Sequence, residues 1–308
     1  MNTFKNVIHV MVEKLTLFSY YADENHARNV AYWLLEKGTG KSRIDCIAHP
    51  QDQLEDAQVD QLFRWVDQLT LEKYPLQYIL ETVPFGVLTI EVAPPTLIPR
   101  PETERWCMDL IGLLQKAEIH TQPLMVLDMC TGSGCIGLAL AQALPKAHVY
   151  AVDISETALE LARRNAQRNF IDSVTFVHSN LFETLDPAIT FDIIVSNPPY
   201  ISHAEWETLE PTVKNWEDSQ ALIAHNNGLE IIEKIITTST LRFLKKESIV
   251  NNYNLPRLLI EIGHSQGDVV SNFFKRYFHD VHVMKDDAGH DRVVCGSTLF
   301  FNEYVHLS

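Results

Sequence analysis

Apolar residues recur at helical spacing through the first quarter of the chain. In one stretch Leu62, Phe63 and Val66 lie three, four and seven positions after Val59, and Leu69 continues the pattern. This spacing places them on one face of a helix that packs against a core. Residues 1–82 are therefore expected to form a small helical N-terminal domain.

The pattern changes at residues 83–100. The sequence PFGVLTIEVAPPTLIPRPETE, which begins at Pro84, combines alternating apolar positions with Gly86 and several prolines. Such a composition is typical of a hairpin and an extended connector rather than of a helix. We expect a hairpin linker over residues 83–100 and a second domain over residues 101–308.

From Leu124 onward, short apolar runs alternate with segments of helical length. The runs are LMVLDM, HVYAVD, SVTFVHS, FDIIVS and RLLIEIG, and helices are expected over 135–144, over 155–169, after Gly228 and from about Ser265. This alternation predicts an α/β fold in which helices cover both faces of a parallel sheet. Residues 281–301 have the pattern of an antiparallel hairpin that closes the sheet.

Composition and charge narrow the possible functions. The 308 residues include 40 acidic and 25 basic side chains, a formal net charge of −15, which is poorly suited to binding nucleic acid by phosphate neutralisation. No apolar segment approaches the roughly 20 residues of a membrane span. The five cysteines lack CxxC spacing, so we expect reduced thiols and no metal site.

A glycine loop follows the strand that is expected to end at Asp128. In CTGSGCIG the residues Gly132, Gly134 and Gly137 have G-x-G-x-x-G spacing, and Asp153 ends the next strand 19 residues after the second glycine. In dinucleotide-binding folds such glycines let the backbone approach the ligand, and the acid binds a ribose hydroxyl. The pattern fits a nicotinamide cofactor or S-adenosylmethionine. The alternative is that the glycines only pack the strand against its helix.

The charge of Asp128 favours S-adenosylmethionine. A carboxylate in this turn can bind the cationic ammonium group of the methionine tail, whereas it would repel a pyrophosphate. We therefore expect Asp128 to contact the cofactor, and we keep the nicotinamide enzyme as an alternative.

The segment SNPPY, which ends the strand FDIIVS, predicts a site for a planar amino group. Two prolines hold the backbone extended and leave their carbonyl groups free to accept hydrogen bonds. The side-chain oxygen of Asn197 and the carbonyl of Pro198 can then accept both hydrogens of an NH2 group and hold its nitrogen toward a methyl donor. Tyr200 is expected to lie against the flat substrate. The alternative is a rigid turn capped by Tyr200.

Four segments resemble one enzyme family. LIPRPETE, LDMCTGSGCIG, AVDIS and SNPPYIS occur in this order, as they do in the HemK/PrmC glutamine N5-methyltransferases. The resemblance implies a class I S-adenosylmethionine-dependent methyltransferase fold, a Rossmann-like sheet with a C-terminal antiparallel hairpin, preceded by a helical domain that recognises the substrate. It implies methylation of the glutamine in the Gly-Gly-Gln motif of a peptide-chain release factor, with no direct nucleic acid partner, no membrane and a monomeric protein.

The resemblance also assigns residues to the site. Its implied cofactor contacts, together with Asp128, are Thr131, Gly132, Gly134, Asp153, Asn180, Leu181 and Asn197. Its implied substrate contacts are Arg100, Asn197, Pro198, Pro199 and Tyr200, of which Asn197, Pro198 and Tyr200 are the expected catalytic residues. Two positions depart from the family pattern, because Cys130 stands where Gly is usual and Asn180-Leu181 stand where Asp-Trp is frequent beside the adenine.

The branch of the family is indicated by further segments. PRPETE resembles the release-factor branch rather than the branch that acts on a ribosomal protein. YPLQYIL, PFG and the insertion KKESIVNNYNLPR resemble fungal mitochondrial members, so we expect a location in the mitochondrial matrix, with the cytoplasm as alternative. NPPY also occurs in adenine N6-methyltransferases of nucleic acids, which remain an alternative. A glutamine methyltransferase that acts on a ribosomal protein and a non-enzymatic binding module remain alternatives too.

Three further features allow two interpretations each. Arg100 and Glu102 are expected to contact the protein substrate or to brace the two domains. Glu261, at the end of a strand, is expected to line the pocket or to be a hydrogen-bonded structural carboxylate. Residues 201–227, with Trp206 and Trp216, are expected to form a substrate-binding lid or a surface loop anchored by its tryptophans.

Overall fold

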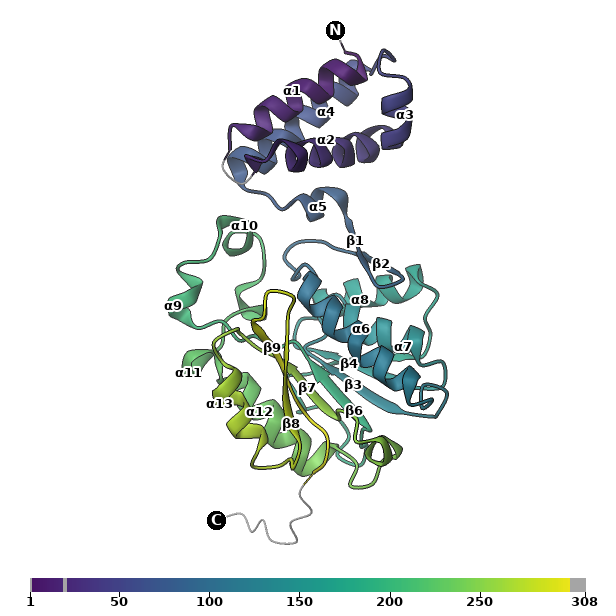
Figure 1. Cartoon of the computed structure of the whole chain (residues 1–308), viewed down its shortest axis with the longest axis vertical. Helices are drawn as coiled ribbons and strands as arrows, with labels where there is room; N and C mark the ends of the chain where they lie inside the picture. Colours follow the sequence, from purple (N-terminus) through teal and green to yellow (C-terminus); the bar gives the residue numbers. More distant parts are fainter. Residues whose placement is uncertain (1, 19–20, 300–308) are drawn as a thin grey trace. The chain divides into compact units, whose positions relative to one another are not determined.

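The computed structural model describes residues 2–18 and 21–299. The chain forms two compact units (Figure 1). The first comprises Met1–Thr82 together with Glu210–Trp216, and the second comprises Val83–Leu209 together with Glu217–Ser308. We call the first the helical unit and the second, which carries the segments expected to form the active site, the catalytic unit. Within the described residues, no helix is long and apolar enough to cross a bilayer.

The helical unit is built from short helices that share one apolar core. Its elements are α1 (Phe4–Thr16), α2 (Glu24–Thr39), α3 (Arg43–Ala48), α4 (Asp56–Asp67), a π-helical turn (Gln68–Glu72), α5 (Leu76–Leu80) and α10 (Pro211–Lys214). The side chains of Thr3, Asp23 and Ser42 accept hydrogen bonds from backbone N–H groups that the first turns of α1, α2 and α3 leave unpaired. Met11, Leu34 and Leu62 are fully buried where α1, α2 and α4 meet.

A segment distant in sequence completes the helical unit. The ring of Trp216 packs edge-on against Tyr74, with 4.6 Å between ring centroids. Its indole N–H donates to the carbonyl of Glu72 over 3.3 Å. Edge-to-face aromatic pairs of this kind add to the stabilisation that burial alone provides. Trp216 therefore anchors residues 210–216 to the helices of this unit.

The catalytic unit contains a seven-stranded sheet with the order β5-β4-β3-β6-β7-β9-β8. The strands are β3 (Met125–Met129), β4 (His148–Asp153), β5 (Val174–His178), β6 (Ile193–Ser196), β7 (Leu258–Glu261), β8 (Val281–Lys285) and β9 (Asp291–Gly296). Strands β3 to β7 are parallel, and β9 runs antiparallel to both β7 and β8. This is the expected α/β methyltransferase-like fold with a C-terminal hairpin, although residues 300–301 of the expected hairpin lie outside the described residues.

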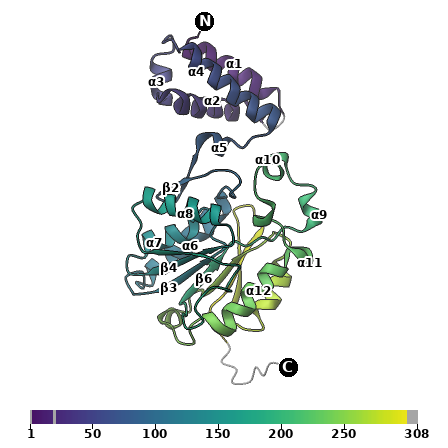
Figure 2. The same ribbon diagram turned by 180° about the vertical axis from the view of Figure 1, so that it is seen from behind.

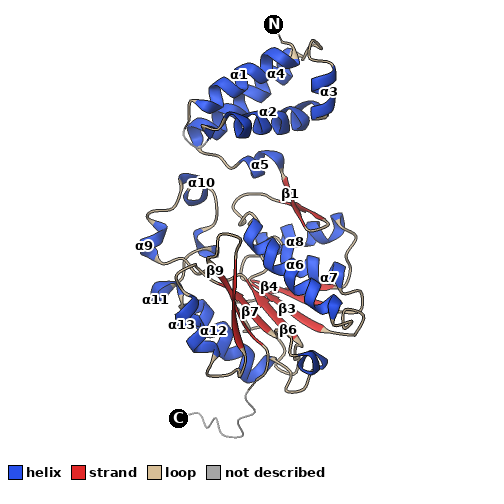
Figure 3. Cartoon of the chain, in the orientation of Figure 1, coloured by secondary structure: helices blue, strands red, loops and turns tan. Residues whose placement is uncertain are grey.

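Helices cover both faces of this sheet, as the apolar runs predicted (Figures 1 and 2). One face carries α6 (Pro101–Lys116), α7 (Cys135–Ala143) and α8 (Glu156–Arg168), and the other carries α12 (Glu230–Thr238) and α13 (Gly267–Phe274). On the second face, Leu127 of β3 and Ile260 of β7 pack with Ile235 of α12 in one buried cluster. The short helices α9 (His203–Trp206) and α11 (His225–Gly228) lie in the segment after β6 (Figure 3).

Strands β1 (Thr82–Phe85) and β2 (Leu88–Glu91) form the expected hairpin. Asn165 of α8 and Asn169, which follows the last residue of this helix, hold the hairpin by hydrogen bonds to its backbone. Asn165 accepts from the Glu91 N–H over 2.6 Å and donates to the carbonyls of Glu91 and Ser133. Asn169 exchanges two hydrogen bonds with the backbone of Thr89. The hairpin is thus tied to α8, and through Ser133 to the glycine loop.

Candidate active site

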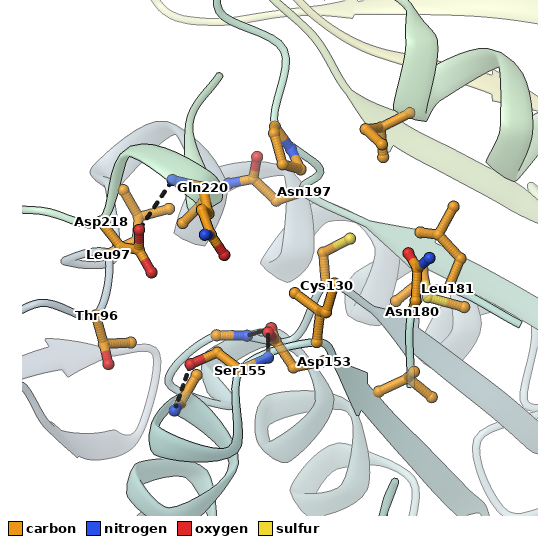
Figure 4. A pocket seen from close by; sticks show the side chains of 18 of the residues that line it. Thr96, Leu97, Cys130, Asp153, Ser155, Asn180, Leu181, Asn197, Asp218 and Gln220 are labelled. Atoms are coloured by element: carbon orange, nitrogen blue, oxygen red, sulfur yellow. Dashed lines mark hydrogen bonds between the residues drawn. The ribbon is translucent and has the colours of Figure 1, made fainter. Parts of the chain in front are cut away.

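A pocket opens at the carboxyl ends of β3, β4 and β6, where the strand order changes direction between β3 and β6 (Figure 4). Open parallel sheets bind their ligands at such positions. The pocket contains about 1000 Å³ of empty space, counted to its open mouth. Every residue that lines it belongs to the catalytic unit.

The glycine loop forms the floor of this pocket. Gly132 lines it with a φ of +55°, and Cys130, which lines it too, has a φ of +61°. Side chains disfavour this left-handed conformation, which explains why Gly is usual at position 130 in the related family. Position 137 requires glycine for a different reason. A Cβ there would lie only 2.9 Å from Oδ2 of Asp128.

Asp128 lies beneath the loop and does not line the pocket. Its Oδ2 accepts hydrogen bonds from the Thr131 hydroxyl over 2.5 Å and from the Gly137 N–H over 2.8 Å. Its Oδ1 is buried without a partner. Burial raises the pKa of this carboxyl to about 7, although the two hydrogen bonds oppose the shift. Asp128 thus supports the loop from the side of α7, and its expected contact with the cofactor remains a prediction.

Asp153, at the end of β4, holds the loop from within the pocket. Its Oδ2 accepts from the Gly132 N–H over 2.8 Å, and its Oδ1 accepts from the Ser155 N–H over 2.9 Å. The carboxylate faces the pocket in Figure 4. A carboxylate has lone pairs for about four hydrogen bonds, so two remain for a ligand diol. Desolvation raises the pKa of Asp153, and the nearby charge of Asp218 adds to this effect.

Asn180 and Leu181 lie on another side of the pocket (Figure 4). Asn180 donates from Nδ2 to Glu183 over 2.8 Å, which directs its amide nitrogen toward Glu183. Leu181 has a φ of +52° and packs against the core cluster. Together with Val152 and Ile231 it gives this end an apolar wall, which suits a flat aromatic base.

Asn197 follows β6 directly, and its side chain reaches the pocket together with Pro199. The Asn197 Nδ2 donates to the Thr103 hydroxyl over 3.3 Å. Within the described part of the chain, no donor is bonded to the Asn197 Oδ1 or to the Pro198 carbonyl. Within the described chain, both oxygens therefore lack a hydrogen-bond donor, and the Asn197 side chain lines the pocket.

Pro198 and Tyr200 do not line the pocket. Pro198 is buried, and the Tyr200 carbonyl accepts from the Gln266 side chain over 3.0 Å. The Tyr200 ring is half-buried against the core cluster. Burial, with the charge of Glu261, raises the pKa of Tyr200, which keeps the phenol protonated. Contact between Tyr200 and a substrate remains a prediction.

Arg100 pairs with Glu217 rather than facing the pocket. Its Nη2 donates to both carboxylate oxygens of Glu217, over 2.8 and 2.7 Å. The Glu217 side chain is only 1% exposed. Desolvation raises the pKa of Glu217, whereas Arg100 opposes the shift. Both residues belong to the catalytic unit, so their ion pair does not brace the two domains. It fixes one loop inside this unit, and contact between Arg100 and the substrate remains a prediction.

The loop fixed by Arg100 contributes lining residues that the sequence did not reveal. The Asp218 N–H donates to the Pro95 carbonyl over 2.8 Å, and Asp218 and Gln220 face the pocket opposite Asp153 (Figure 4). Thr96 and Leu97 of the connector line it as well. Within residues 201–227, Asp218, Gln220 and Ile223 therefore line the pocket, whereas Trp216 anchors residues 210–216 to the helical unit.

The expected site residues thus fall into two groups. Those that line the pocket are Gly132, Asp153, Asn180, Leu181, Asn197 and Pro199. Those that lie outside its lining are Arg100, Asp128, Thr131, Gly134, Pro198 and Tyr200. Thr131 is buried and its hydroxyl donates to Asp128, and Gly134 is the N-cap of α7. Glu261 is a buried carboxylate that accepts from Thr103 and Trp106 and does not line the pocket.

Comparison with known proteins identifies the family. The family model of the PrmC N-terminal domain matches residues 21–80, and that of the methyltransferase small domain matches residues 110–218. The catalytic domain of hMettl16, solved with the MAT2A 3'UTR hairpin 1, covers 91% of this chain and 93% of its own with a TM-score of 0.52. At 17% identity it shows the fold alone.

Two curated relatives cover most of the chain. The release factor glutamine methyltransferase of Flavobacterium psychrophilum is 34% identical over 88% of this chain and 92% of its own. The enzyme of the same name from Rhodopirellula baltica is 33% identical over 84% of this chain and 90% of its own. With these similarities, the glycine loop and the NPPY corner, the chain belongs to the family of release factor glutamine methyltransferases.

Proposed function

We propose that this protein transfers a methyl group from S-adenosylmethionine to the side-chain amide nitrogen of the glutamine in the Gly-Gly-Gln motif of a peptide-chain release factor. The observation that carries the proposal is the NPPY corner, where the Asn197 side chain lines the pocket and, within the described residues, neither its Oδ1 nor the adjacent Pro198 carbonyl is bonded to a donor. The names of the relatives support the choice of a release factor as substrate.

The residues of the pocket fit the cofactor. Asp153 has lone pairs left for the ribose hydroxyls, and the apolar wall beside Leu181 suits the adenine. Two aspartates, Asp153 and Asp218, line the pocket, and its described lining residues include no lysine, arginine or histidine. This charge distribution suits a cationic ligand. When bound, S-adenosylmethionine supplies an electrophilic methyl group on a sulfonium.

Asn197 and Pro198 would position the reacting amide. Amide nitrogen is a weak nucleophile because its lone pair is delocalised into the carbonyl group. Two acceptors that bind both N–H hydrogens stabilise the positive charge that develops on the nitrogen as it attacks. They also fix the nitrogen along the line of transfer. The Asn197 side chain is neutral, so it does not attract the cationic methyl donor into the position that the substrate amide must occupy. The proton is lost to solvent after transfer.

Methyl transfer to purified release factor tests this function. The protein is incubated with S-adenosylmethionine labelled in the methyl group and either intact release factor or a variant with Gln→Ala in its Gly-Gly-Gln motif. We expect label on the intact factor and none on the variant. Equal label on both, or label on the adenine of added RNA or DNA instead, would exclude this substrate.

We also propose that the protein acts as a monomer in the mitochondrial matrix. The support is the likeness of residues 74–80, 84–86 and 245–257 to fungal mitochondrial members of the family. Fractionation of cells that express the tagged protein tests the location, because enrichment in the cytosol would contradict it. Light scattering measures the molar mass of the purified protein in solution, and a mass of twice that of one chain would contradict the monomer.

A further inference from the structure

We propose that Thr103 and Glu261 are positioning residues that determine which end of the Asn197 amide faces the substrate. This inference rests on the proposed role of Asn197 as the acceptor for the glutamine amide. An asparagine side chain has an oxygen at one end and a nitrogen at the other, and only the oxygen can accept a hydrogen bond. A flipped side chain would present two donors to a substrate group that is itself a donor.

The sheet register brings these residues together. In the parallel pair of β6 and β7, Ser196 is opposite Ile260. The residues that follow, Asn197 and Glu261, therefore lie at the same edge of the sheet. Thr103 and Trp106 are three residues apart on α6, hence on one face of that helix. All of these residues belong to the catalytic unit.

The hydrogen bonds form a chain with one direction. The Glu261 Oε2 accepts from the Thr103 hydroxyl over 2.7 Å and from the Trp106 indole N–H over 2.8 Å. A hydroxyl has one hydrogen, which Thr103 gives to the carboxylate. Only lone pairs then remain on the Thr103 oxygen, so it can accept from Asn197 but cannot donate to it. The Asn197 Nδ2 consequently points at Thr103, over 3.3 Å, and Oδ1 is left for the substrate.

Burial makes this arrangement selective. Thr103 and Glu261 are each only 2% exposed, so water does not readily exchange for either partner. A flipped Asn197 would place its Oδ1 against the lone pairs of the Thr103 oxygen, which is repulsive, and would leave two N–H donors facing the donors of the glutamine amide. Burial raises the pKa of Glu261, and the hydrogen bonds from Trp106 and Thr103 oppose this shift because they stabilise the carboxylate as an acceptor. Glu261 therefore acts on the reaction through Thr103 and Asn197.

The experiment compares Thr103→Val, which has nearly the same shape without the hydroxyl, with Thr103→Ser, which keeps it. The full-length proteins are assayed for kcat and KM with release factor, and for the Kd of S-adenosylmethionine. We expect Thr103→Val to lower kcat about 10- to 100-fold, with the Kd for the cofactor changed less than about threefold. Thr103→Ser should retain kcat within about threefold. Thr240→Val serves as control, since it removes a helix hydroxyl that donates to the Ile236 carbonyl elsewhere in the unit.

A double-mutant cycle separates positioning from a merely structural role. If Thr103 acts only through Asn197, then Thr103→Val should change kcat less than about twofold in an Asn197→Ala background. An undiminished effect in that background, or an unchanged kcat for Thr103→Val alone, would overturn the inference. Should Thr103→Val fail to fold, Thr103→Ala takes its place in the same cycle. Absence of glutamine methylation by the wild-type protein would instead refute the proposed function.

Discussion

At the scale of single residues, the glycine loop depends on a buried carboxyl group. Asp128 accepts hydrogen bonds from Thr131 and Gly137, yet its Oδ1 has no partner. Its pKa is raised from 3.8 to about 7 because burial disfavours the charged form. Between these two values the folded protein binds a proton that the unfolded chain lacks. Stability contributed by this group is therefore lost as the pH rises from about 4 to about 7.

Replacement of Asp128 tests this linkage. Asp128→Asn cannot ionise, so its free energy of unfolding should lack the corresponding fall between pH 4 and pH 7. The difference in pH dependence between the two proteins should reach about 4 kcal/mol, from roughly 3 pH units at 1.36 kcal/mol each. Urea unfolding at several pH values measures it. The same pH dependence in both proteins would show that Asp128 is ionised throughout.

The position of Asp128 also shows how far the sequence predicts the site. The strand ends predicted that Asp128, Asp153 and Asn197 converge on one crevice, and Asp153 and Asn197 both line the pocket. They did not reveal which face of the sheet Asp128 occupies. A signal was present, since Leu127 and Met129 alternate with it and both pack into the cluster on the α12 and α13 face. Side chains alternate along a strand, so Asp128 must point toward α7.

At the scale of elements, the pocket wall depends on an ion pair between two segments distant in sequence. Arg100 precedes α6, and Glu217 begins the segment that carries Asp218 and Gln220 into the pocket. Residues 217–223 have no regular periodicity, and nothing in the sequence links position 100 to position 217. This part of the pocket follows from tertiary pairing and could not be predicted from pattern alone.

Removal of Arg100 should cost more than removal of both partners. Arg100→Ala leaves the buried Glu217 carboxylate without its partner, and we expect a loss of stability of about 3 kcal/mol. The double variant Arg100→Ala with Glu217→Gln removes the stranded charge and should recover a measurable part of that loss. Thermal or urea unfolding compares the two. Equal or greater destabilisation in the double variant would indicate that Glu217 finds another cation.

Asp218 should distinguish the cofactor from its demethylated product. S-adenosylmethionine carries a sulfonium charge that S-adenosylhomocysteine lacks, and Asp218 faces the pocket together with Asp153. Asp218→Asn should therefore raise the Kd for the cofactor about 3- to 10-fold and leave that for the product within about twofold. Calorimetric titration measures both constants. Asp186→Asn is the matched control, because each aspartate Oδ1 accepts from the N–H two residues later over 2.9 Å. A parallel loss of affinity for both ligands would contradict an electrostatic role.

At the scale of the whole molecule, the pocket that fits the cofactor lies entirely within the catalytic unit. All residues that line the pocket belong to the catalytic unit, which has its own buried cluster. The helical periodicity of the first quarter predicted the helical unit, but it gave no indication that Trp216 and its neighbours also belong to it. That association depends on the packing of Trp216 against Tyr74, which lie 142 residues apart.

A chain that begins at residue 83 should bind the cofactor and lose the protein substrate. We expect the Kd for S-adenosylmethionine to stay within about threefold of the full-length value, because the lining is complete. Methylation of intact release factor should fall by at least about tenfold if the helical unit recognises it. Calorimetry and label transfer measure the two properties. Full methylation by the folded fragment would place substrate recognition in the catalytic unit instead.

The most direct test of the central claim is a crystal structure of the protein with S-adenosylhomocysteine and a release factor domain that carries the Gly-Gly-Gln motif. The account predicts that the glutamine amide nitrogen lies about 2.7–3.2 Å from both the Asn197 Oδ1 and the Pro198 carbonyl oxygen. It also predicts that the Asn197 Nδ2 still faces Thr103. A glutamine amide bound away from this corner, or an Asn197 that presents its nitrogen to the substrate, would contradict it.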